Sequence, residues 1–178
     1  GIKEILGDAF YGCGGITSIS VPESIERIGY QAFANSGIKS ASLPSGITKI
    51  ESAIFKNCTE LTSVVLPDSL TDTGYYTFSG CTSLTSVNIP KNASVIGYES
   101  FKGCTALTAI DLPESIEKIE RSAFEGCTSL TSIKLPDKRV EMDYFVFHDC
   151  TALKTITIPE HFTNIGVSAF MGCTSLKT

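Results

Sequence analysis

The sequence predicts an α/β repeat solenoid in which about eight coils of 23 residues stack into one elongated domain over residues 1–178. Proline gives the first sign of the repeat, because the seven prolines are spaced by 22 residues once and then by 23 residues five times. Phenylalanine follows the same period in eight of its ten occurrences, and cysteine in all seven. Three residue types with one shared period indicate a single structural unit repeated along the chain.

The three rows can be read directly from the sequence. The prolines are Pro22, Pro44, Pro67, Pro90, Pro113, Pro136 and Pro159. The phenylalanines are Phe10, Phe33, Phe55, Phe78, Phe101, Phe124, Phe147 and Phe170. The cysteines are Cys13, Cys58, Cys81, Cys104, Cys127, Cys150 and Cys173, with Ser36 in the one vacant position. In that repeat the segment Asn35–Ile38 is one residue shorter than its counterparts, which accounts for the single interval of 22.

Each repeat divides into a strand and a return arm. Val87 and Ile89 alternate with Asn88, as a half-buried strand requires, and Pro90 then ends the pairing. Apolar residues of the return arm recur at intervals of three and four, which favours a turn followed by a short helical or 3₁₀ segment. One such unit cannot bury its own apolar side chains, so neighbouring coils must cover one another. We therefore expect one parallel β-sheet, short helical return arms and a continuous core.

Composition excludes two classes of protein. The net charge of -5 lacks the basic balance that nucleic-acid binding requires. No stretch approaches the roughly 20 apolar residues that span a bilayer, so we expect no membrane insertion by this chain. The 42% share of apolar residues is that of a chain with a packed interior.

The repeat resembles a known family. The strand segment Leu130–Pro136, of the form L-x-x-I-x-L-P, and the preceding A-F-x-G-C-T-S-L of 123–130 are similar to the BspA-type leucine-rich repeat of bacterial and some protozoan surface proteins. The resemblance covers essentially the whole chain. It implies a right-handed superhelix with a strand-lined concave face, and a cell-surface or secreted parent protein with a role in adhesion.

Both ends of the sequence fall within a repeat. The chain begins just after a strand position and ends at Leu176–Thr178, two residues into the next one. We therefore expect it to be an excerpt of a longer repeat array. Apolar undersides left open on the end coils predict end-to-end self-association at high concentration.

The cysteines invite a metal or disulfide interpretation, which their spacing does not favour. No two of them lie closer than 23 residues, so the sequence contains no CxxC zinc pair. Stacked parallel side chains would hold the Cβ atoms about 4.8 Å apart, beyond the usual disulfide range of roughly 3.5 to 4.5 Å. We predict free, buried, structural thiols.

The sequence contains no convincing catalytic or cofactor site. His148, Asp149 and Cys150 are the residue types of a cysteine hydrolase, but sequence neighbours do not form a triad. His161 lies in a turn after Pro159, and neither a phosphate-binding glycine loop nor an HExxH motif occurs. We expect no enzyme, no cofactor and no metal.

A column of acidic residues follows the prolines. Stacked carboxylates could attract calcium, but a solvated rim that keeps the solenoid soluble is the simpler interpretation. The column consists of Glu23, Asp68, Glu114, Asp137 and Glu160.

Two surfaces are candidates for binding a partner. The strand face is the outward position between the two inward strand residues, where the row is Ser20, Ser42, Val65, Asn88, Asp111, Lys134 and Thr157. The aromatic row lies eight and nine residues past the prolines and consists of Tyr30, Tyr75, Tyr76, Tyr98, Tyr144 and Phe145. Aromatic rings at coil spacing could stack on sugars, form a protein contact patch, or cover the edge of the core.

The sequence thus predicts a non-catalytic binding or adhesion module. The expected partner is a host protein, a matrix component or a glycan, held over several coils. The alternative is a structural spacer, a rigid stalk that presents another domain of the parent protein. The two hypotheses differ in whether either surface binds anything.

Overall fold

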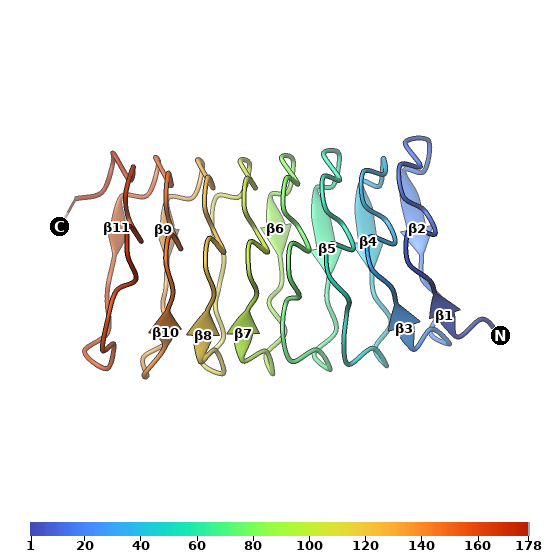
Figure 1. The fold of residues 1–178 in the computed structure, drawn as a ribbon, viewed down its shortest axis with the longest axis horizontal. Helices are drawn as coiled ribbons and strands as arrows, with labels where there is room; N and C mark the ends of the chain where they lie inside the picture. Colours follow the sequence, from blue (N-terminus) through green and yellow to red (C-terminus); the bar gives the residue numbers. More distant parts are fainter. Residues whose placement is uncertain (178) are drawn as a thin grey trace.

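The protein is a stack of coils, and the computed structural model describes residues 1–177 of it (Figure 1). Each strand is two or three residues long, and every strand pairing is parallel. The strands are β1 (Glu4–Ile5), β2 (Ser18–Ser20), β3 (Arg27–Ile28), β4 (Ser40–Ser42), β5 (Ser63–Val65), β6 (Ser86–Val87), β7 (Val95–Ile96), β8 (Lys118–Ile119), β9 (Ser132–Ile133), β10 (Glu141–Met142) and β11 (Thr155–Ile156).

The first row of strands lies where the sequence predicts it, just before the prolines. Strands β2, β4, β5 and β6 form a four-stranded sheet, and β9 pairs with β11 farther along the stack. A bridge between Asp111 and Lys134 continues this second part of the row. Figure 1 shows these strands along one side of the stack. The second residue of each strand packs against the core, and Val64 and Ile133 are buried there.

The expected single sheet is divided after β6, and on the other side of that strand Asn88 shortens its pairing with β5. The side-chain oxygen of Asn88 accepts the backbone N–H of Leu66 at 2.9 Å, and its Nδ2 donates to the Leu66 carbonyl at 2.8 Å. The side-chain amide thus takes both backbone positions that the next strand residue would have used. A ladder needs backbone groups in these places, so the pairing of β6 with β5 ends here.

The return arms carry a second row of strands. Strands β1 and β3 pair at one end, β7, β8 and β10 form a three-stranded sheet farther along, and a bridge joins Asp72 to Val95. The prediction of helical or 3₁₀ return arms is therefore wrong: residues 1–177 contain strands, bridges and turns, and no helix. The fold class is a β-solenoid with strands on two sides of the stack.

Left-handed residues explain why no helix forms. Ser122 (φ 56°) and Gly126 (φ 71°) flank Phe124 in one return arm, and every other coil has such a pair four residues apart. The amides of Ser122, Phe124 and Gly126 donate to carbonyls of the next coil at 2.8–3.0 Å. A helix would direct these amides to carbonyls four residues back in the same coil. Alternate amides of the return arm thus donate to the next coil, while those of Ala123 and Glu125 make turn bonds within their own coil.

The phenylalanine row forms the spine of the core, as predicted. Seven successive ring pairs stack with centroid separations of 5.2–5.9 Å and interplanar angles of 4–19°. The six inner rings, from Phe33 to Phe147, are fully buried. Each buried ring contributes about 2 to 3 kcal/mol of gross hydrophobic free energy. One apolar cluster continues from Val21 to Ala169, so the coils share a single core.

Candidate functional site

The cysteine row is structural. All seven thiols are free, and the five from Cys58 to Cys150 are buried. Six of them donate an S–H···O bond at 3.0–3.2 Å to a phenylalanine carbonyl of the preceding coil. The pairs are Cys58–Phe33, Cys81–Phe55, Cys104–Phe78, Cys127–Phe101, Cys150–Phe124 and Cys173–Phe147. Ser36, in the vacant position, instead contacts the Cys58 sulfur at 3.5 Å.

The structure does not bring His148 and Cys150 together as a hydrolytic pair. Burial raises the pKa of Cys150 to about 12, so the thiol stays protonated and donates to the Phe124 carbonyl. The imidazole Nδ1 of His148 lies 3.5 Å from a carboxylate oxygen of Asp149 and 3.8 Å from one of Glu125, without a hydrogen bond. A thiol that is never ionised near neutral pH cannot serve as a nucleophile.

The acidic column caps backbone amides. A proline has no N–H, and in three coils the residue after the proline donates its own N–H to the acidic side chain of the preceding coil. The pairs are Ser45 to Glu23 (3.2 Å), Lys91 to Asp68 (3.1 Å) and Asp137 to Glu114 (3.0 Å). Among residues 1–177, no group of three or more His, Cys, Asp or Glu side chains is placed to hold a metal ion. The same residues include no helix able to cross a membrane.

The strand face is exposed but shallow. Val65 is its one large apolar member, 57% exposed on β5. Asn88 turns its amide to the Leu66 backbone, so it presents little free hydrogen-bonding capacity. Lys134 lies 4.0 Å from the Glu114 carboxylate, across the bridge from Asp111. The strand face therefore carries no aromatic side chain that could anchor a partner in the predicted way.

The aromatic row divides into exposed and packed rings. Tyr30, Tyr75 and Tyr144 are each about half exposed, at 48%, 51% and 51%. The other three rings are partly buried against neighbouring side chains. Tyr76 and Tyr98 meet edge to face at 5.0 Å, with Lys56 over the Tyr76 ring at 4.7 Å, and Arg121 lies 5.7 Å from the Phe145 ring centroid. The packed rings fix the edge of the coil, and the exposed ones remain available to a ligand.

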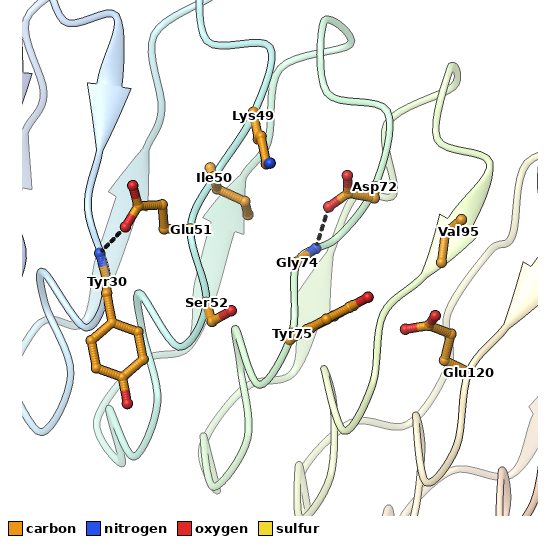
Figure 2. Close-up of a pocket in the computed structure, with 10 residues that line it drawn as sticks. All are labelled: Tyr30, Lys49, Ile50, Glu51, Ser52, Asp72, Gly74, Tyr75, Val95 and Glu120. Atoms are coloured by element: carbon orange, nitrogen blue, oxygen red, sulfur yellow. Dashed lines mark hydrogen bonds between the residues drawn. The ribbon is translucent and has the colours of Figure 1, made fainter.

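A hollow of about 440 Å³ opens beside the first two exposed tyrosines (Figure 2). Sequence analysis did not identify it. Its lining combines aromatic, charged and small residues from five consecutive coils. The lining residues are Tyr30, Lys49, Ile50, Glu51, Ser52, Asp72, Gly74, Tyr75, Val95 and Glu120.

Small residues create the hollow. Glu51, Gly74, Gly97 and Glu120 occupy one position of four successive coils, and the two glycines in the middle leave a gap between the two glutamates. Gly97 is required there, because a Cβ atom would lie 2.3 Å from the Gly74 carbonyl oxygen. One position later, Ser52 stands between Tyr30 and Tyr75 and keeps the two rings apart. The gap follows from backbone packing and is therefore a fixed feature of the surface.

Backbone amides orient the carboxylates of the hollow. Glu51 accepts the N–H of Tyr30 at 2.9 Å, and Glu120 accepts that of Tyr98 at 2.9 Å. Glu51 also pairs with Arg27, whose hydrogen bond lowers the pKa of this carboxyl. Glu51 and Glu120 could have been found in the sequence by comparing one repeat position across the coils, because each stands where coils such as those of Gly74 and Gly97 have glycine.

The sequence matches the family description "BspA type Leucine rich repeat region" in six copies, over residues 1–108 and 94–178. No curated protein matches it.

Several solved bacterial structures share the fold. A leucine-rich repeat protein from Bacteroides ovatus is 28% identical with a TM-score of 0.73, over 98% of this chain and 57% of that one. The T. pallidum leucine-rich repeat protein is 30% identical with a TM-score of 0.71, over 99% and 72%. A leucine-rich repeat protein from Eubacterium ventriosum is 27% identical with a TM-score of 0.80, over 91% of this chain and 44% of that one. The chain thus spans less than two thirds of the first and third of these relatives.

Proposed function

Because the chain belongs to the BspA-type leucine-rich repeat family, we propose that it is a non-catalytic binding module of a bacterial cell-surface or secreted protein, with the aromatic row as its contact surface. The observation that carries this proposal is the half exposure of Tyr30, Tyr75 and Tyr144 on one side of the solenoid. Tyrosine offers a large, rigid and amphipathic contact area at low entropic cost. The strand face has no comparable anchor.

A binding screen with two matched triple variants tests the proposal. The aromatic variant replaces Tyr30, Tyr75 and Tyr144 with alanine, and the strand-face variant replaces Val65, Asp111 and Lys134 with serine. Arrays of host matrix proteins and glycans are screened with the parent chain, and each hit is repeated with both variants. We expect hits that the aromatic variant loses and the strand-face variant keeps.

Thermal melts of both variants accompany the screen, because tyrosines that only cover the core would lower stability without affecting binding. Unchanged binding by a destabilised aromatic variant would contradict the proposal. Loss in the strand-face variant alone would move the contact to the strands.

A second function is favoured by the continuity of the stack. The phenylalanine spine runs unbroken from Phe10 to Phe170, and hydrogen bonds join each coil to the next. A solenoid of this kind is suited to hold another domain away from a cell surface. Complete silence in the screen would favour this spacer role over recognition.

A further inference from the structure

We propose that the hollow between Tyr30 and Tyr75 binds a neutral oligosaccharide. This inference rests on the proposed binding function of the aromatic row and names its ligand class. Three features of the hollow carry it: its size and permanence, its two flanking rings, and its mixture of hydrogen-bonding groups.

The size of the hollow suits a small ligand. Its volume of about 440 Å³ lies within the roughly 300–1,000 Å³ typical of small-molecule sites. Ile50, Gly74 and Val95 are among its lining residues, and Gly97 approaches Gly74 so closely that the two coils leave no room for a side chain there. A site of fixed shape does not have to be formed when the ligand arrives.

The two rings suit the apolar face of a sugar. Tyr30 and Tyr75 stand on either side of Ser52, each with about half of its surface free (Figure 2). A pyranose ring presents C–H groups on its faces and hydroxyls around its edge. Packing the C–H face on tyrosine removes apolar surface from water and leaves the hydroxyls at the rim free to hydrogen-bond.

The polar groups suit the hydroxyls. Asp72 is oriented by the Gly74 N–H, which its Oδ1 accepts at 2.8 Å, and Glu120 by the Tyr98 N–H at 2.9 Å. Figure 2 shows both carboxylates and the Lys49 ammonium group around the opening. A hydroxyl both donates and accepts, so it can use the carboxylate oxygens and the ammonium group together. Pre-oriented groups bind such a ligand with little loss of side-chain freedom.

The charges favour a neutral ligand over an ionic one. The lining holds three carboxylates and one ammonium group, and Arg27 and Lys118 lie beside two of those carboxylates, so a sugar that carries carboxylate or sulfate meets no net positive charge. A basic peptide gains little in return, because Arg27 already pairs with Glu51 at 2.5 Å and Lys118 lies 3.9 Å from Glu120. Hydrogen bonding and stacking, which neutral sugars use, are unaffected by this internal pairing.

An array of neutral, amino and acidic oligosaccharides, followed by calorimetric titration of the hits, tests the proposal. Ser52→Tyr fills the hollow with the residue that four other coils hold at this position, so the coil is expected to tolerate it. We expect Ser52→Tyr to abolish binding and Tyr75→Ala to weaken it about tenfold, the loss of one anchoring contact. Tyr11→Ala is the matched control, because this tyrosine is 49% exposed and belongs neither to the lining of the hollow nor to the aromatic row, and its affinity should stay within about twofold of the parent's.

The outcomes separate this inference from the proposed function. Sugar binding that Ser52→Tyr leaves intact overturns the assignment of the hollow. Protein binding through the aromatic row without any sugar binding also overturns it, while the proposed function stands. Binding of basic peptides that is lost in Asp72→Asn and Glu120→Gln and at high salt overturns it in favour of a cationic ligand. If no probe binds, both proposals are overturned.

Discussion

The thiol of Cys127 donates a hydrogen bond to the backbone carbonyl of Phe101, with a sulfur-to-oxygen distance of 3.1 Å. Both side chains are fully buried, and the two residues belong to successive coils. The same bond recurs at five other coil boundaries, so the cysteine row and the phenylalanine row are coupled along the core. This coupling leads to three predictions about the thiols.

Replacing Cys127 with alanine should lower the free energy of unfolding by about 1 to 2 kcal/mol, because it leaves a small cavity and removes one buried hydrogen bond. The loss is limited because the Phe101 carbonyl keeps its turn bond from the Cys104 N–H. Urea denaturation measures it. Cys13→Ala is the control, since Cys13 is only partly buried. Equal losses in the two variants would show that the inter-coil bond contributes nothing.

The thiols should react in an order set by burial. Burial raises the pKa of Cys104 and Cys127 well above that of an ordinary thiol, so these side chains are neither exposed nor ionised in the native protein. We expect a thiol-specific reagent to label the partly buried Cys13 and Cys173 first, and the five buried thiols only after unfolding. Peptide mass spectrometry during labelling gives the order. Early modification of Cys104 would contradict it.

Alkaline pH should destabilise the protein. Burial raises the pKa of Cys150 to about 12, whereas an unfolded thiol ionises near 8.5. Below pH 8.5 both states are protonated and the full stability is present. Above it only the unfolded state loses its protons, so the free energy of unfolding falls by up to about 1.4 kcal/mol per pH unit for each such thiol. Urea titrations with reductant between pH 7 and 10 measure how steeply the free energy of unfolding falls with pH. Cys150→Val should make this fall less steep by the contribution of one thiol. An unaltered slope in this variant would contradict the assignment.

Gly97→Ala should be strongly destabilising and Gly46→Ala close to neutral. A Cβ on Gly97 would lie 2.3 Å from the Gly74 carbonyl oxygen, whereas a Cβ on Gly46 would meet nothing within 4 Å. Overpacking against backbone costs about 1 to 3 kcal/mol, because the coil has to move away from its neighbour. Thermal and urea denaturation of the pair measure the difference. Similar stabilities would mean that the coils separate more easily than their packing indicates.

The spine of the fold was predictable from the sequence because burial and period coincide. Phe124 and Cys127 recur at one interval, and only stacking can bury a residue that recurs in this way. The return arm was not predictable by the same reasoning. Intervals of three and four fit a helix, but the left-handed backbone of Ser122 directs the nearby amides to the next coil. The spacing of apolar residues indicates which side chains face inward, but it does not indicate which carbonyls accept the backbone N–H groups.

The candidate site was predictable only in part. Tyr75 belongs to a periodic row and could be identified as a candidate. The hollow beside it depends on the missing side chains of Gly74 and Gly97, and on the interruption of the row at Ser52. Such sites arise where neighbouring coils depart from the repeat together. Comparing the same position in adjacent coils is therefore more informative than the average repeat.

The hydrogen bonds between return arms also determine how the solenoid responds to force. They join one coil to the next, as the bond from the Phe124 N–H to the Val146 carbonyl does. Tension applied at the two ends is therefore carried by these boundaries in series, and we expect them to yield one after another, the weakest first. Each coil that yields releases 23 residues, or roughly 80 Å of extended chain. We therefore expect the stack to lengthen under tension in steps of about one coil.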